Sequence, residues 1–197
     1  NIDSFSNIKS SAISNLFLTL MTSVDIIVFR KLFPNELSGF YSAISTLGKI
    51  PLFLSAILFT YFLTEGSYNF FKNDKSKNIL YYNLTLNFII FTFFIIIYYI
   101  FGEQILLLIF NSQYITFSKD LYYLTIAFTF VGFIKIIIIY FFTKNKNNYA
   151  LPLFIGLVIV LILCSLSDTS KDFIETMVFG YMFLFIIMLG YLIKDKS

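Results

Sequence analysis

The chain has 197 residues, of which 58% are hydrophobic and only 13% are charged. Soluble domains typically carry roughly 25% charged and about 45–50% apolar residues, so a soluble domain is excluded and lipid is the expected solvent. One cysteine and no histidine leave zinc, haem and Cys–His nucleophile chemistry without their usual ligands and bases. The net charge of +3 comes from short basic clusters between apolar segments, which fits membrane topology better than nucleic-acid binding.

Six segments are long and apolar enough to be transmembrane helices, because about 20 mainly apolar residues cross the roughly 30 Å of hydrocarbon. In chain order they are Ser11–Phe29, Phe40–Leu63, Ile79–Phe101, Leu121–Phe142, Tyr149–Leu166 and Phe173–Ile193. Their apolar residues do not alternate with polar ones, which favours helices over the strands of a membrane barrel. We therefore predict an all-α membrane protein whose residues 1–197 form a single bundle of about six transmembrane helices.

The connection between the third and fourth segments, Phe101–Tyr114, has an unusual composition. It contains a short apolar stretch, Ile105–Phe110, between polar residues such as Glu103 and Asn111. This stretch is too short to span a bilayer. We expect a short helix near residues 103–111 that lies in the outer membrane interface.

The basic residues are distributed unevenly between the two sides of the predicted bundle. With a cytoplasmic N-terminus, the inside holds Lys9, Lys72, Lys75, Lys77, Lys144, Lys146, Lys194 and Lys196. The outside then holds Arg30, Lys31, Lys119 and Lys171. The positive-inside rule therefore favours a multi-pass protein of the cytoplasmic membrane with both termini of this segment in the cytoplasm.

Polar residues form one stripe along each of the first two segments, and polar groups inside a membrane are costly enough for their direction to be informative. In the first segment the stripe consists of Ser11, Asn15, Thr19, Thr22 and Asp25. In the second it consists of Ser38, Ser42, Ser45, Thr46, Lys49, Thr60 and Thr64, with a bend expected at Pro51. The stripes either line a water-filled, ligand-accepting cavity or mediate helix packing through their hydroxyls and amides.

Lys49 favours the cavity. It lies about 13 Å along its helix from the expected outer boundary, which is far for a snorkelling side chain. A wet cavity or a carboxylate partner is therefore expected near it. Asp25 is weaker evidence, because it lies about 7 Å from Arg30 by helical rise and could pair with it locally.

Two stretches carry a recognisable pattern. Asp25–Ile50 reads DIIVFRKLFPNELSGFYSAISTLGKI, in which an intramembrane Asp, a basic pair and a turn with Pro34 precede a small-residue helix containing LGKI. Phe101–Tyr114 reads FGEQILLLIFNSQY. Together these stretches cover about 40 residues and resemble the second half of polysaccharide and oligosaccharide-lipid flippases, a group within the multidrug/oligosaccharidyl-lipid/polysaccharide exporter superfamily.

This resemblance implies two six-helix bundles that face each other across a central cavity and rock between inward-open and outward-open states. The chain begins at Asn1 with a polar stretch that lacks a signal-peptide layout, so we expect it to be the C-terminal bundle of a larger transporter whose N-terminal six-helix bundle is missing. The implied substrate is a lipid-linked saccharide that carries a diphosphate, moved across the cytoplasmic membrane for polysaccharide or cell-envelope biosynthesis.

The implied substrate-binding residues belong to the two stripes and the turn between them. They are Lys49, Ser42, Ser45, Thr46, Asn15, Thr19, Thr22, Asp25, Arg30 and Lys31. On this interpretation Lys49 offers a compact cation to the phosphates. Arg30 and Lys31 receive the diphosphate at the outer face, and Asp25 neutralises Lys49 or binds a coupling ion.

Three other functions stay open as alternatives. An ion-coupled multidrug exporter of the same superfamily would use buried carboxylates for ion exchange, but only Asp25 lies clearly within a predicted span. A membrane-embedded enzyme would need a catalytic acid, base or metal site, and the sequence offers no clustered candidates, so we expect no enzyme activity, metal or cofactor. A structural or partner-binding membrane protein is the third alternative, and the polar stripes argue against it.

Overall fold

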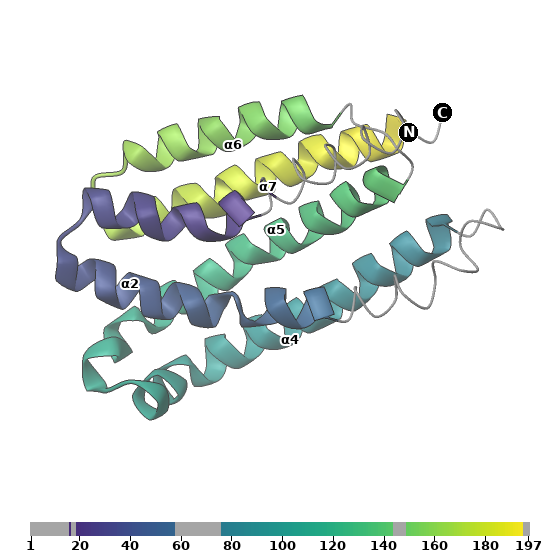
Figure 1. Ribbon diagram of the computed structural model, residues 1–197. Helices are drawn as coiled ribbons and strands as arrows, with labels where there is room; N and C mark the ends of the chain where they lie inside the picture. The colour runs from purple at the N-terminus through teal and green to yellow at the C-terminus, as the bar shows by residue number, and fades with distance from the viewer. Residues whose placement is uncertain (1–15, 17–18, 58–75, 144–148, 195–197) are drawn as a thin grey trace.

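The computed structural model describes residue 16 and residues 19–57, 76–143 and 149–194 of the chain (Figure 1). Helices account for 93% of these residues and no strand occurs among them. The prediction of an all-α protein is therefore confirmed for the described part of the chain.

The helices are α2 (Asn35–Gly48), α4 (Ser76–Ile109), the 3₁₀ helix η1 (Ser112–Phe117), α5 (Ser118–Thr143), α6 (Ala150–Ser165) and α7 (Ser170–Lys194). Residues 19–32 and 50–57 are also helical. Four of the described helical stretches have the length and composition to cross a membrane: Asn35–Ile57, Leu80–Ile109, Ser112–Phe141 and Ser170–Lys194. These four stretches indicate a membrane protein. α6 is also apolar but shorter, with 16 residues.

The helices α4, α5, α7 and α6 lie side by side in that order, and α2 packs against α5 (Figure 1). α5 occupies the centre of this arrangement. Its side chains Leu121, Leu124, Phe128, Val131 and Ile134 are all fully buried. In contrast, α4 lies at one edge and exposes most of its apolar surface, as expected for a helix that faces lipid.

The predicted interfacial helix near residues 103–111 is wrong as a separate element. α4 continues without a break from Ser76 to Ile109, so this stretch forms its last turns. The residues from Glu103 to Ile109 include no proline and are mostly good helix formers, and a single glycine such as Gly102 costs only about 1 kcal/mol. At 34 residues, α4 is about 51 Å long and exceeds the hydrocarbon thickness of about 30 Å.

The second helix is interrupted at Lys49. α2 ends at Gly48 and helical backbone resumes at Ile50, one residue before Pro51. Proline has no N–H, so the carbonyl of Leu47 loses the donor that position 51 would otherwise supply. The hydroxyl of Tyr98 on α4 donates to this carbonyl over 3.0 Å. A backbone N–H at the end of α2 also donates to it, so the Leu47 carbonyl has two donors despite the proline.

Small residues set the contacts between several helices. A Cβ added to Gly180 on α7 would lie 2.8 Å from Val160 Cγ2 on α6, so these two helices approach too closely for a larger residue. A Cβ added to Gly48 would meet Leu124 and Thr125 of α5 at 3.4–3.5 Å. Close packing through glycine is typical of helices in membranes, where dispersion contacts rather than the hydrophobic effect hold them together.

Candidate functional site

A buried ion pair joins the first helical segment to α2. Asp25 lies in the helical residues 19–32 and is 2% exposed, and Lys49 follows α2 and is 4% exposed. In an α-helix the Cα–Cβ bonds tilt toward the N-terminus. The Lys49 side chain can therefore extend back along α2, toward the turn that connects α2 to residues 19–32, and meet Asp25 there.

Lys49 and two further donors surround the Asp25 carboxylate. Lys49 Nζ donates to both Oδ1 and Oδ2 of Asp25 over 3.0 Å. Ser45 Oγ donates to Oδ2 over 2.7 Å, and the Tyr41 hydroxyl lies 3.2 Å from the same oxygen. Tyr41, Ser45 and Lys49 are spaced by four residues, so one face of α2 supplies all three donors. Charge-assisted bonds of this kind are stronger than neutral ones.

Aromatic and sulfur-containing side chains enclose the pair. Phe29 stacks on the Tyr41 ring with centroids 3.9 Å apart, and Phe173 of α7 meets both rings edge-on. Lys49 Nζ lies 4.8 Å from the centroid of the Phe128 ring of α5, within the range of a cation–π interaction. The charges therefore sit in an apolar surrounding of low dielectric, where each depends on the other for compensation.

The Asp25–Lys49 pair can change its ionic partners or its protonation state. While paired, the two side chains are neutral as a unit, and both carboxylate oxygens accept hydrogen bonds. If Lys49 moved to another anion, the Asp25 carboxylate would be left to take up a proton or a cation. Among the described residues no group of three or more His, Cys, Asp and Glu side chains could hold a metal ion.

The structure brings three of the ten expected site residues together, namely Asp25, Ser45 and Lys49. The expectation of a carboxylate partner for Lys49 is met by Asp25, which pairs with Lys49 and not with Arg30. Arg30 and Lys31 are exposed at the end of their helix. Asn15 lies outside the described residues.

The hydroxyls of three further expected site residues bond to carbonyls of their own helices. Ser42 Oγ donates to the Ser38 carbonyl over 2.7 Å, and Thr46 Oγ1 to the Ser42 carbonyl over 2.8 Å. Thr22 Oγ1 donates to the carbonyl of Thr19 over 3.0 Å. Such bonds satisfy a hydroxyl within the helix. Of Thr19, only the backbone carbonyl takes part in these bonds.

Sequence reasoning missed several parts of this site. Tyr41 could have been identified, because it precedes Ser45 and Lys49 on the same helical face. Phe128 and Met177 could not, since their contacts arise from the packing of α5 and α7 on the first two helices; Met177 Sδ lies 3.2 Å from the Tyr41 hydroxyl.

Comparison with protein-family models, with curated proteins and with solved structures gives no match for this chain.

Proposed function

We propose that the chain is one bundle of a membrane transporter that moves a lipid-linked saccharide across the cytoplasmic membrane by alternating access. The buried Asp25–Lys49 pair is the observation that carries this proposal. Ionisable residues within transmembrane segments are rare and commonly mark the path of a substrate or ion. A second bundle, from further chain or from another copy, would complete the cavity.

Exchange of partners would let Lys49 bind substrate without creating an isolated charge. In the closed arrangement Asp25 holds the ammonium, with Ser45 and Tyr41 donating to the same carboxylate. If the hairpin of residues 19–57 separated from α5 and α7, a substrate diphosphate could replace Asp25 as the partner of Lys49. The carboxylate would keep its two hydroxyl donors and would be free to accept a proton, which offers a route to ion coupling.

A transport assay with matched variants tests this proposal. The 197-residue chain, alone and with a candidate second bundle, is reconstituted in proteoliposomes that contain a fluorescent polyprenyl-diphosphate sugar, and a membrane-impermeant quencher reports its movement. We expect the Asp25→Asn/Lys49→Met double variant to fold but to lose flipping. Lys171→Gln, which removes an exposed charge of α7, serves as the control and retains activity. Full flipping by the double variant would contradict the proposed role of the pair.

A structural role is the second candidate, and the completeness of the site favours it. Both oxygens of Asp25 have donors, and the pair is closed off from solvent. Such a pair could simply fix the register of the first helical hairpin, as buried polar groups do in some proteins. On this alternative the double variant supports the same partner binding or assembly as the wild type, and no saccharide lipid moves in any sample.

An ion-coupled drug exporter differs from the flippase in cargo rather than in architecture. Efflux of an organic cation that responds to a proton or sodium gradient, and that is lost in Asp25→Asn, would favour it over the flippase.

A further inference from the structure

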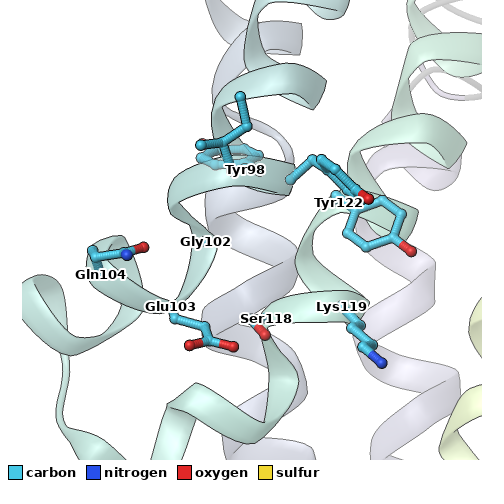
Figure 2. Close-up of a pocket in the computed structure, with 9 residues that line it drawn as sticks. Tyr98, Gly102, Glu103, Gln104, Ser118, Lys119 and Tyr122 are labelled. Carbon is cyan, nitrogen blue, oxygen red and sulfur yellow. The ribbon is translucent and has the colours of Figure 1, made fainter.

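A second polar site lies where α4 approaches its C-terminal end and α5 begins. A cavity of about 420 Å³ opens between these two helices (Figure 2). Tyr98, Glu103 and Gln104 line it from α4, and Ser118, Lys119 and Tyr122 line it from α5. Its volume falls within the range of small-molecule sites, about 300–1,000 Å³.

Tyrosines place this cavity at the level of the lipid headgroups. In α4 the pair Tyr81 and Tyr82 precedes the pair Tyr98 and Tyr99 by 17 residues, which corresponds to about 25 Å along the helix. Tyrosines concentrate at the two membrane–water interfaces, and the spacing of these pairs is close to the hydrocarbon thickness of about 30 Å. Tyr99, which is 71% exposed, therefore lies at the boundary, and Glu103 lies one turn beyond it.

The cavity contains one charge of each sign. Figure 2 shows the Glu103 carboxylate directed toward Ser118, whereas the Lys119 side chain extends away from Glu103 on the far side. Neither side chain forms an ion pair within the described part of the chain. Both side chains are exposed, and two charges of opposite sign that are not paired with each other and lie across one cavity match a ligand that itself carries a separated positive and negative charge.

We propose that this cavity binds the headgroup of a phosphoethanolamine lipid. The ligand ammonium would donate to the Glu103 carboxylate and lie against the tyrosine rings, whose faces attract cations. The phosphate would accept from Lys119, which acts as a compact cation. A purely anionic headgroup is disfavoured by Glu103, and a neutral sugar would make no use of Lys119. This lipid site does not depend on whether the chain transports a saccharide.

Competition among lipids tests the proposal on the full 197-residue chain. The protein is extracted from bilayers of equimolar phosphatidylethanolamine, phosphatidylcholine, phosphatidylglycerol and a glucosyl diacylglycerol of matched acyl chains, and native mass spectrometry identifies the lipids that remain bound. We expect phosphatidylethanolamine to be enriched, and Glu103→Gln and Lys119→Gln each to reduce this enrichment by about tenfold, because each removes one charge-assisted bond.

Glu175→Gln and Lys171→Gln provide matched controls. These residues form an exposed ion pair of 3.7 Å at the beginning of α7 and do not line the cavity, so their variants should retain the wild-type lipid profile. Unfolding curves of all four variants show whether they fold like the wild type. Equal retention of the four lipids, enrichment of phosphatidylglycerol or of the glucosyl lipid, or an unchanged profile in a folded Glu103→Gln variant would each overturn the proposal.

Discussion

The Asp25 and Lys49 side chains are more stable together than either would be alone. Removal of one partner of a buried pair leaves an uncompensated charge and typically costs about 3–5 kcal/mol. We therefore expect Lys49→Met alone to destabilise the protein by about this amount, and Asp25→Asn/Lys49→Met to recover most of the loss. The side-chain amide that replaces the carboxylate in the double variant can still accept hydrogen bonds from Ser45 and Tyr41.

The single cysteine offers a measurement of this effect. Cys164 is the one cysteine of the chain and is 2% exposed, so a thiol-reactive dye reports its exposure during thermal unfolding. If Lys49→Met and the double variant unfolded at the same temperature, the two charges would not be coupled. Pairing with Lys49 would then not stabilise the buried Asp25 carboxylate.

The hydroxyl of Tyr98 has a role that a second double-variant experiment can isolate. Tyr98→Phe removes one of two donors to the Leu47 carbonyl, the other being a backbone N–H at the end of α2, and the loss of a single hydrogen bond costs about 0.5–1.5 kcal/mol. Pro51→Ala restores a backbone N–H four residues after Leu47. We expect Tyr98→Phe to lower the unfolding temperature less in a Pro51→Ala background than in the wild type. Equal losses in both backgrounds would show that Pro51 and Tyr98 act independently.

At this scale the sequence predicted a carboxylate partner for Lys49 and offered Asp25 for that role, but it left open whether Asp25 pairs with Lys49, pairs with Arg30 or binds an ion. Asp25 and Lys49 are 24 residues apart on different helices, and their meeting depends on the turn between those helices. The Phe128 ring and Met177 depend on two further helices. Such contacts follow from tertiary packing, about which the spacing of residues within one helix carries no information.

At the scale of the helices, the glycines of α7 make a direct prediction. A Cβ at Gly180 would meet the stiff side chain of Val160 at 2.8–3.3 Å, whereas a Cβ at Gly190 meets nothing within 4 Å. Gly180→Ala should therefore destabilise the packing of α6 on α7 by about 1–3 kcal/mol. Gly190→Ala should be neutral or stabilising, because alanine is the better helix former.

Both α7 variants can be followed with the same dye, since Cys164 is buried on α6. Earlier labelling of Gly180→Ala relative to Gly190→Ala is the expected result. Labelling of the two variants at the same temperature would show that α6 and α7 separate enough to admit a methyl group.

Hydropathy located the helices well and their ends poorly. Four of the predicted spans overlap helices that have the length and composition to cross a membrane. However, α4 runs to Ile109, well past the predicted end of its span at Phe101, because polar residues such as Glu103 and Gln104 are compatible with helix even where they are incompatible with hydrocarbon. The predicted span therefore ended where the continuous hydrophobic segment ended, although the helix continues to Ile109.

At the scale of the whole molecule, the orientation in the membrane is open to direct measurement. Asp168, between α6 and α7, and Lys194, at the end of α7, lie at opposite ends of α7. In a Cys164→Ser background we expect Asp168→Cys to react with a membrane-impermeant maleimide on intact cells, as the positive-inside rule predicts for this connection. Lys194→Cys should react only after the membrane is permeabilised. The reverse labelling pattern would invert the predicted topology and place the headgroup cavity on the cytoplasmic side.

The central position of α5 has a consequence for biosynthesis. α7, which covers one side of α5, ends 51 residues after Thr143, so at roughly 5–20 residues per second α5 is made about 3–10 s before its last partner. The hydroxyls of Thr125 and Thr129 are satisfied within α5 itself during this delay, because Thr125 donates to the Leu121 carbonyl and Thr129 to the Thr125 carbonyl. The side chains of Asp25 and Lys49 bond to each other rather than to their own helices, but both lie in the hairpin of residues 19–57, which is synthesised before α5. The nascent chain can therefore neutralise its most costly charges before the helices that will enclose them exist.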